Sequence, residues 1–250
     1  MQTETTTDRI VFLGSPVDRI TIPQTLQWIT RSVQRRQPRF VAVVNANKYY
    51  LMARNGRLKE IITRADLILP EYATVWGARK LRLPNLHHSG GLLLTKALLP
   101  YAAEKGIKLY LLGARPEVVS AAARRVQIDH PSLRIAGFHH GYLQSAEATA
   151  SVIRDIRRTE PEVLLVAMGS PMQEFWIDSN KREAGIPVNI GVGGSFDILS
   201  GMKPDTPDWT RGRGLEWLFR LALEPKAYFR RYLVTNFWFV WQVIRGKRRA

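Results

Sequence analysis

The 250-residue sequence contains no cysteine, which excludes disulfide bonds, thiolate metal sites and a cysteine nucleophile. It also lacks a run of about 20 apolar residues, the length that a helix needs to cross a bilayer. The longest candidate, residues 232–244, is interrupted by Thr235, Asn236 and Gln242. Residues 1–9 are polar and lack the apolar core of a secretory signal, so we expect the protein to stay inside the cell.

Two arrangements that hold a divalent metal are missing as well. Four of the five histidines form adjacent pairs, at 87–88 and 139–140, and neighbouring side chains point in different directions. No Asp-x-Asp occurs, although many nucleotide-sugar enzymes use it to hold a cation on the diphosphate. We therefore expect neither metal nor cofactor, and expect backbone amides with Arg or Lys to neutralise a bound phosphate.

Positive charge, by contrast, is in large excess. The formal net charge is +16, which indicates an anionic partner: nucleic acid, lipid headgroups or a phosphorylated substrate. From residue 203 to the end there are eleven Lys or Arg against four Asp or Glu, and ten of the 24 aromatic residues. Basic and aromatic side chains are thus concentrated in the last fifth of the chain.

Short apolar segments alternate with amphipathic ones along most of the chain. We predict strands at 40–45, 67–69, 108–112, 134–137, 163–168 and 188–191, and helices at 23–36, 49–64, 91–105, 116–129, 146–158 and 173–184. This alternation predicts an α/β fold, a Rossmann-like and mostly parallel sheet with helices on both faces. We expect one domain over residues 1–200 and a basic, aromatic, helical appendage over residues 201–250.

Small and polar residues follow several predicted strands. In an open α/β sheet the loops at the carboxyl ends of the strands share one edge, where ligands bind. The candidate substrate-binding residues at these ends are Asn45, Asn47, Gly113, Arg115, Gly169, Gln173, Gly191, Gly193, Gly194, Ser195 and Asp197. Ser89, which follows no predicted strand, is a further candidate.

The segment from Gly191 to Asp197 carries three glycines and a serine between a strand and a helix. Glycines there let backbone N–H groups approach a phosphate closely. The spacing differs from the dinucleotide pattern G-x-G-x-x-G, so it gives little support to nicotinamide or flavin binding. The alternative is a tight turn with no ligand.

The loops at residues 113–116 and 169–173 can each be interpreted either as a binding site or as an ordinary helix start. Arg115, after Gly113, is placed to pair with a phosphate, or the segment simply begins a helix with Pro116 in its first turn. Gln173, four residues after Gly169, either extends into a cleft to hydrogen-bond a sugar hydroxyl or belongs to a capped helix start.

Glu71 follows the predicted strand 67–69. A carboxylate there is a candidate base for the hydroxyl of an acceptor, or it is a favourable charge at a helix start.

In the C-terminal segment, basic residues lie beside aromatic and aliphatic ones, as in helices that lie in the plane of lipid headgroups. The alternative is ordinary packing against the domain. The basic residues that we expect to meet an acceptor diphosphate or a lipid surface are Arg211, Arg213, Arg220, Arg230 and Arg231.

Several separate segments, in the same order along the chain, resemble the WecG/TagA/CpsF family of glycosyltransferases. They are residues 169–176, 191–197, 214–218, 224–225 and 230–233. The resemblance implies transfer of an N-acetylhexosamine-type sugar from a UDP-sugar to a polyprenyl-diphosphate-linked acceptor in bacterial cell-surface polysaccharide synthesis. It also implies metal independence and an appendage that brings the enzyme to the inner face of the cytoplasmic membrane.

By position, the resemblance assigns the family's Thr-x-Asn motif to residues 43–45, which keeps Asn45 and replaces Thr by Val43. The family's Pro-Asp-Gly, whose Asp is the proposed base, falls on residues 70–72, so Glu71 keeps the acid on a longer side chain. An Arg-x-x-Gly-x-Asp pattern falls on residues 87–92 without its Arg and Asp. Gln173 matches directly.

Two other hypotheses follow from the sequence. The lost Thr, Arg and Asp suggest a non-catalytic regulator of polysaccharide assembly that binds a nucleotide-sugar or lipid. Charge alone suggests a nucleic-acid binder, which we rank below both membrane-surface interpretations. The expected partners are a nucleotide-sugar donor, a lipid-diphosphate acceptor, an anionic membrane surface and, in one possibility, a second copy of the chain.

Overall fold

The computed structural model describes residues 8–210 and 215–247. Their elements fall into two compact units, and each is described on its own. Unit 1 comprises Met1–Thr21, Val43–Gly90 and Asp205–Ala250, and unit 2 comprises Ile22–Ala42 and Gly91–Pro204. The last helices therefore belong to the same unit as the N-terminal hairpin, whereas a boundary at residue 200 stays a prediction.

The principal sheet has six strands in the order β4-β3-β8-β7-β5-β6, and a separate hairpin pairs β1 with β2. Neighbouring strands are parallel in the pairs β3–β8, β8–β7, β7–β5 and β5–β6. The strands are β1 (Arg9–Phe12), β2 (Ser15–Asp18), β3 (Arg39–Val44), β4 (Leu67–Pro70), β5 (Lys108–Gly113), β6 (Arg134–His139), β7 (Val163–Ala167) and β8 (Val188–Gly191). All six strands predicted for the parallel sheet are confirmed, as is the α/β fold class.

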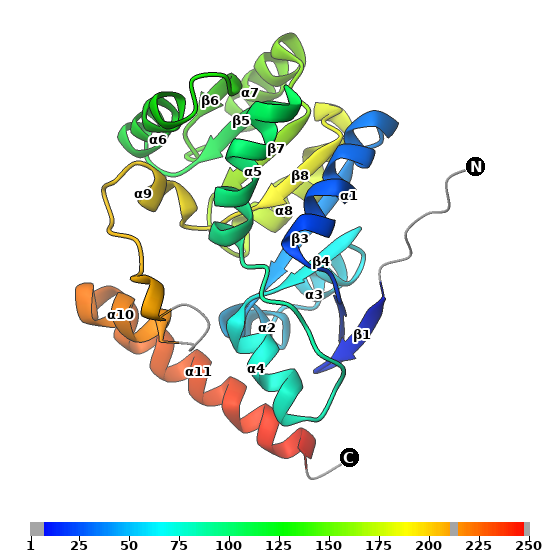
Figure 1. The fold of residues 1–250 in the computed structure, drawn as a ribbon, viewed down its shortest axis with the longest axis vertical. Coiled ribbons are helices and arrows are strands. Elements are labelled where there is room, and N and C mark those ends of the chain that lie inside the picture. The colour runs from blue at the N-terminus through cyan, green and yellow to red at the C-terminus, as the bar shows by residue number, and fades with distance from the viewer. Residues whose placement is uncertain (1–7, 211–214, 248–250) are drawn as a thin grey trace. The chain divides into compact units, whose positions relative to one another are not determined.

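The helices connect these strands in chain order (Figure 1). They are α1 (Ile22–Arg35), α2 (Ala46–Met52), α3 (Gly56–Thr63), α4 (Tyr72–Lys80), α5 (Gly91–Lys105), α6 (Pro116–Asp129), α7 (Ala146–Thr159), α8 (Met172–Ala184), α9 (Ser195–Leu199), the 3-10 helix η1 (Asp208–Thr210), α10 (Glu216–Leu223) and α11 (Pro225–Lys247). Among the described residues, no helix combines the length and apolar character needed to cross a bilayer.

Unit 2 is a layered α/β structure around β8, β7, β5 and β6. Every residue of β7 is buried, and so are those of β5 from Leu109 to Gly113, as expected for central parallel strands covered on both faces. One group of helices is linked by the contacts α1–α5, α5–α9 and α9–α6, and the other by the contact α7–α8 (Figure 1). The core of unit 2 lies between these helices and the strands.

Unit 1 begins with a hairpin that the sequence did not reveal. Leu13 and Gly14, between β1 and β2, have φ of 46° and 72°, as in the two-residue turns whose twist matches that of paired strands. A leucine with positive φ is unusual, so the turn has none of the Asn-Gly character by which such hairpins are recognised.

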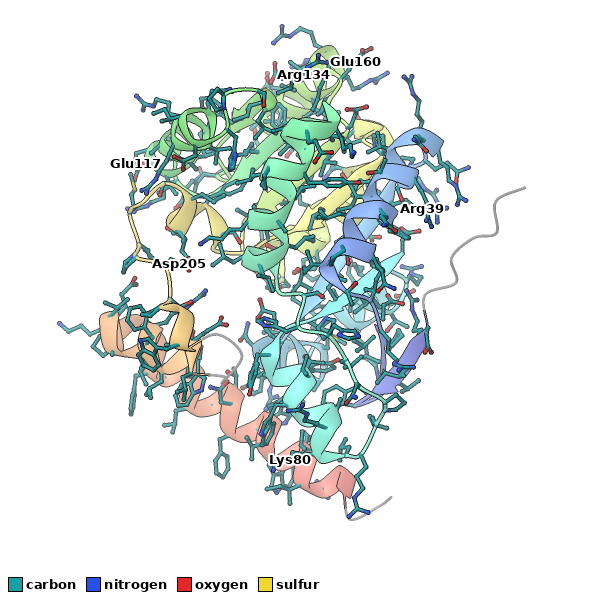
Figure 2. The ribbon with its side chains drawn as sticks, viewed as in Figure 1. Arg39, Lys80, Glu117, Arg134, Glu160 and Asp205 are labelled. Atoms are coloured by element: carbon teal, nitrogen blue, oxygen red, sulfur yellow. The ribbon has the colours of Figure 1, made fainter. Side chains whose placement is uncertain are left out.

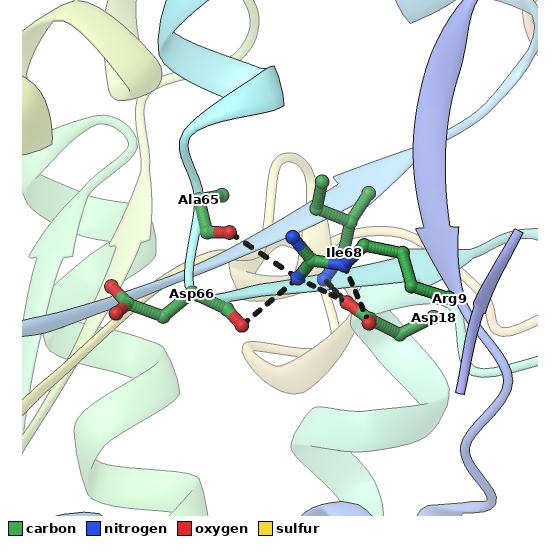
Figure 3. Close-up of polar contacts among 5 residues, drawn as sticks. All are labelled: Arg9, Asp18, Ala65, Asp66 and Ile68. Atoms are coloured by element: carbon green, nitrogen blue, oxygen red, sulfur yellow. Dashed lines mark hydrogen bonds and ion pairs between the residues drawn. The ribbon is translucent and has the colours of Figure 1, made fainter. Parts of the chain in front are cut away.

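The buried carboxylate of Asp18 joins this hairpin to β4, and within the hairpin it forms an ion pair with the partly exposed Arg9 (Figure 3). Asp18 is 0% exposed, and its carboxylate accepts hydrogen bonds from Arg9 Nε at 2.8 Å and from the backbone N–H of Ile68 at 2.6 Å. Arg9 also donates to the carbonyls of Ala65 and Asp66. The hairpin is thereby fixed to the segment that leads into β4 and Glu71.

The predicted helix at 49–64 is wrong in one respect, because the chain forms two helices there. Asn55 is the N-cap of α3, and its side chain accepts a hydrogen bond from Leu58 N at 3.0 Å. An Asn side chain that caps a helix competes with continuation of the preceding one, so α2 ends at Met52. Helix α4 was not predicted at all.

Helix α11 packs one face against α2 and α4 (Figure 1). Phe239 is buried, with its ring centroid 5.9 Å from those of Phe12 and Tyr49. Val243, one turn later, lies against Gly77 of α4, where an added Cβ would be 3.1 Å from its Cγ2. The packing alternative for the C-terminal segment is therefore correct for this face of the helix.

The opposite face of α11 is apolar and exposed. Phe237 is 74% exposed, the largest value among the exposed apolar side chains of this helix. The other exposed apolar residues described on α11 are Phe229, Leu233, Val234, Val240, Trp241 and Ile244, and those of α10 are Trp217, Leu218 and Leu223. We call these ten residues the C-terminal apolar surface. An exposed apolar area of this size is typical of an interaction site.

Candidate functional site

In unit 2 the predicted glycine loops all follow carboxyl ends of neighbouring parallel strands. Gly113 ends β5, Gly169 follows β7 and Gly191 ends β8. Arg134, at the start of β6, and Glu160, just before β7, lie at the opposite edge of these strands (Figure 2). The candidate phosphate-binding loops of this unit therefore share one edge, as the fold predicts.

Gly113 is required by close approach of two backbones. Its φ is 135°, and an added Cβ would lie 2.5 Å from the carbonyl carbon of Ala167. The next residue, Ala114, donates its N–H to Ala167 O at 2.8 Å. No side chain fits here, so β5 and β7 end in direct backbone contact.

The loop after β8 is held by Gln173. The backbone N–H of Gly193 donates to Gln173 Oε1 at 3.0 Å, and a Cβ on Gly191 would lie 2.6 Å from Gln173 Nε2. Three of the predicted residues thus lie together, and the turn is built around this amide.

The amide itself is buried, and both its nitrogen and its oxygen are hydrogen-bonded. Gln173 is 2% exposed, and its Nε2 donates to Glu174 Oε1 at 2.7 Å. Glu174 is 0% exposed and accepts a second hydrogen bond, at 2.6 Å, from Ser170 Oγ. The structure therefore gives Gln173 a supporting position beneath the glycine turn, and its contact with a sugar stays a prediction.

The outer side of the same turn is open. A Cβ added to Gly193 or Gly169 would have nothing within 4 Å, and one on Gly194 would meet only Asp197 Oδ2, at 3.6 Å. Ser195 is turned inward, where its hydroxyl donates to Val192 O at 2.7 Å. The exposed elements of the loop are therefore glycine backbone with one neighbouring carboxylate.

Arg115 lies beside the Gly113 turn in an exposed position. Its Nε is 3.3 Å from Glu117 Oε1, and both side chains are more than half exposed. Such a pair contributes about 0–1 kcal/mol, so Arg115 can exchange this partner for a phosphate at little cost.

A cluster of rings at the end of β6 was not included in the predicted site. The ring centroids of His139 and His140 are 4.3 Å apart, and Tyr142 lies 6.2 Å from His140. Gly141, between them, donates its N–H to Ala114 O at 2.9 Å and so attaches the cluster to the Gly113 loop. The sequence interpretation considered the histidine pair only as a metal site, whereas the exposed Tyr142, three residues after the end of β6, is the signal that indicates the cluster.

Tyr110 of β5 and Asp155 of α7 form a hydrogen-bonded pair in which both side chains have shifted pKa values. Tyr110 donates its hydroxyl to Asp155 Oδ2 at 2.8 Å. The hydrogen bond from Arg158, supported by that from Tyr110, lowers the pKa of Asp155, whereas burial raises the pKa of Tyr110. Asp155 therefore stays ionised and Tyr110 neutral over the ordinary range of pH.

In unit 1 the predicted base lies against a predicted substrate residue. Asn45 Nδ2 donates to Glu71 Oε2 at 2.8 Å, while Asn45 Oδ1 caps α2 by accepting from Lys48 N at 3.0 Å. Glu71 is the N-cap residue of α4, but its side chain makes no capping hydrogen bond there. The carboxylate is thus directed by Asn45 and is not used to cap the helix.

The other predicted residues of unit 1 differ in exposure. Asn47 is half-buried in the first turn of α2. Ser89 is 0% exposed, and its hydroxyl donates to Ile20 O at 3.2 Å. Ser89 therefore anchors its own segment, and a substrate contact by this residue stays a prediction.

Three of the five predicted basic residues lie in the described helices. Arg220 is half-buried in α10, Arg230 is exposed on α11, and the backbone of Arg231 belongs to α11. Arg211 and Arg213 lie outside the described residues.

Comparison with known proteins agrees with the resemblance. The model of the Glycosyl transferase WecG/TagA/CpsF family matches residues 10–250. A protein of Bacillus subtilis (strain 168), named N-acetylglucosaminyldiphosphoundecaprenol N-acetyl-beta-D-mannosaminyltransferase, is 28% identical over 198 residues, which cover 79% of this chain and 76% of that protein. A protein of the same name from Staphylococcus aureus (strain NCTC 8325 / PS 47) is 29% identical over 247 residues, covering 97% of this chain and 95% of that protein.

Proposed function

Because this chain belongs to the glycosyl transferase WecG/TagA/CpsF family, we propose that it transfers an N-acetylhexosamine from a UDP-sugar to a polyprenyl-diphosphate-linked acceptor. The reaction would serve the synthesis of a bacterial cell-surface polysaccharide. The observation that carries this proposal is the pairing of Asn45 with Glu71, which turns a carboxylate away from helix capping and leaves it available for proton transfer.

The glycine edge of unit 2 is the proposed donor site. Backbone at Gly193 and Gly194 has open space on its outer side, so a diphosphate can approach it closely. The N–H of Gly193 is held by Gln173 Oε1, so we propose the N–H of Gly194 as the amide that meets the diphosphate. Asp197, whose carboxylate adjoins Gly194, suits a hydroxyl of ribose or sugar better than a phosphate, because two anions would repel. Arg115 would supply the positive charge.

The ring cluster of His140 and Tyr142 is the proposed place for the nucleobase. Tyr142 is 55% exposed, and its segment is hydrogen-bonded to the Gly113 loop. Aromatic rings offer a flat surface on which a base stacks, at about 1–3 kcal/mol per base. Stacking on these rings would hold a uracil base without a metal ion and without the dinucleotide-binding pattern G-x-G-x-x-G.

Glu71 is the proposed general base. The acceptor hydroxyl would lose its proton to the carboxylate as its oxygen bonds to the anomeric carbon of the donor sugar. The bond from that carbon to the diphosphate breaks, and UDP leaves with the electron pair. Backbone amides and Arg115 stabilise the charge on the leaving group, so we propose that no metal is needed.

The C-terminal apolar surface is the proposed contact with the membrane. Its apolar side chains on α11 are accompanied by exposed Lys226, Arg230 and Arg245. Each basic residue near an anionic bilayer adds about 1 kcal/mol, while the apolar side chains enter the headgroup region. We therefore place the protein at the inner face of the cytoplasmic membrane, where a lipid-linked acceptor is within reach.

A transfer assay tests the proposal. The purified protein is incubated with radiolabelled UDP-N-acetylhexosamines and a polyprenyl-diphosphate N-acetylglucosamine acceptor, and the label is followed into the lipid phase. We expect transfer from at least one UDP-sugar and none from GDP- or CDP-sugars. Binding of UDP-sugars without transfer to the acceptor would instead support a non-catalytic regulator.

A further inference from the structure

Two ionisable side chains of unit 1 meet over Gly90. A Cβ built on this glycine would lie 3.0 Å from Glu71 Cγ, 3.4 Å from Glu71 Oε1 and 3.0 Å from His88 Nε2. The carboxylate and the imidazole therefore face the same small space, which the absence of a side chain at residue 90 keeps open.

The imidazole is held in this place from two sides. The ring of Tyr72, the residue after Glu71, meets the ring of His88 edge-on, with centroids 6.1 Å apart and an interplanar angle of 81°. The next residue, Ser89, donates its N–H to Pro70 O at 2.9 Å, which attaches the His88 segment to the end of β4. Side chain and backbone are thus both fixed relative to Glu71.

The two oxygens of Glu71 have different surroundings. Oε2 accepts the hydrogen bond from Asn45, whereas Oε1 is the oxygen nearest to the space above Gly90. Among the described residues, the atoms nearest to this space belong to Glu71 and His88, and the ring of Tyr72 lies against that of His88. An imidazole nitrogen can accept a proton and release it again, so His88 is the neighbouring side chain suited to receive one from Glu71.

We propose that His88 receives, through Oε1 of Glu71, the proton that Glu71 removes from the acceptor hydroxyl. The inference rests on the proposed function, in which Glu71 is the general base. The proton passes from the acceptor oxygen to Glu71 and then to Nε2 of a neutral His88, which releases it to solvent after UDP has left. Glu71 is thereby an anion again for the next turnover, and His88 acts as a positioning and proton-accepting residue behind the base.

The test is the substitution His88→Gln, in which an amide nitrogen replaces Nε2 without the ability to take up a proton. General acid–base groups contribute about 10²–10⁴-fold, so we expect a relay behind the base to contribute about 10- to 100-fold in kcat. KM for the UDP-sugar should stay within about twofold, because the proposed donor site lies in unit 2. Added imidazole should restore part of the lost kcat, which a purely structural role would not allow.

His130→Gln is the matched control, since His130 follows α6 in unit 2 and has no place in the proposed reaction. It should keep the wild-type kcat and show no response to imidazole. Wild-type kcat in His88→Gln would overturn the inference, and so would a loss of kcat that imidazole leaves unchanged.

Gly90→Ala provides a second variant should His88→Gln fold poorly. Its Cβ would fill the space between the carboxylate and the imidazole, so we expect a similar loss of kcat but no rescue by imidazole, because the methyl group leaves no room for it. A wild-type rate here would also contradict the inference. Glu71→Gln distinguishes an error in the proposed base, Glu71, from an error in the proposed role of His88. If Glu71→Gln keeps its activity, the proposed base itself is wrong; if it is inactive while His88→Gln is normal, only the role of His88 fails.

Discussion

Removal of the Gln173 side chain is expected to destabilise unit 2 and disturb the glycine turn together. In Gln173→Ala the N–H of Gly193 loses its acceptor, and the fully buried Glu174 loses a donor 2.7 Å away. An unsatisfied buried group costs about 1–3 kcal/mol, with charged groups at the upper end, so we expect a loss of about 3–4 kcal/mol in the free energy of unfolding.

A double-mutant cycle with Gly191→Ala makes this prediction specific. The new Cβ would lie 2.6 Å from Gln173 Nε2, so the substitution alone should cost about 1–3 kcal/mol through forced displacement of the amide. In the Gln173→Ala background that obstacle is gone. Gly191→Ala should then cost much less, leaving a coupling energy of about 1–2 kcal/mol.

Urea unfolding followed by circular dichroism measures all four corners of the cycle. Gln127→Ala, which removes an exposed amide bonded to Pro131 O, is the control and should change the free energy of unfolding by less than about 0.5 kcal/mol. Strictly additive costs for the two substitutions would refute the idea that the turn is built around the Gln173 amide.

Three further predictions concern other parts of the molecule. Asp18→Ala should lower the free energy of unfolding by about 3–5 kcal/mol, because Arg9 and the N–H of Ile68 lose a fully buried partner; urea unfolding checks this, and a change below about 1 kcal/mol would contradict it. Burial raises the pKa of Tyr110 in the folded state, so its contribution to stability is complete below the unfolded pKa of about 10 and is lost as pH rises above it. Tyrosinate absorbance should therefore show phenols that ionise only with alkaline unfolding, and Tyr110→Phe should reduce that component by one phenol, because burial also raises the pKa of Tyr49; an unchanged component in Tyr110→Phe would refute the prediction. Replacing Phe237 and Trp241 by Ser should weaken binding to anionic vesicles by about tenfold or more without loss of thermal stability, since both side chains are exposed; unchanged sedimentation with vesicles would argue against membrane contact.

The parallel sheet could be predicted because its strands are continuous apolar runs of the usual length. Residues 188–191 and the helix at 91–105 were predicted with their observed bounds. In the central strands β5, β7 and β8 almost all residues are buried, so composition alone distinguishes these strands from their amphipathic connections, whereas β6 is partly exposed.

Elements whose formation depends on tertiary contacts were missed. The β1–β2 hairpin turns at Leu13 with positive φ, and its position is fixed by the hydrogen bonds of Arg9 and Asp18 with residues 65–68, so neither feature has a local sequence pattern. Helix α4 contains Gly77, a poor helix former, because a Cβ there would lie 2.6 Å from the ring of Phe12. Packing, rather than propensity, determines both elements.

For the candidate site, the sequence predicted loop positions better than side-chain directions. The Gly113 and Gly191 loops follow strand ends as expected, yet Gln173 and Ser89 turn into the interior, where backbone groups need partners. Whether a polar side chain serves the protein or a ligand depends on which buried N–H or C=O lies nearby. These neighbouring groups come from distant parts of the chain, so the residues around a polar side chain in the sequence do not identify its partner.

The measurement that tests the account most directly compares sugar transfer and UDP-sugar affinity in Glu71→Gln. The variant keeps a side chain of the same length beside Asn45 but cannot accept a proton from the acceptor. We predict that calorimetry gives a UDP-sugar affinity within about twofold of wild type, while transfer to the lipid acceptor falls by about 10²–10⁴-fold. Transfer at the wild-type rate would contradict the central claim that this carboxylate is the base.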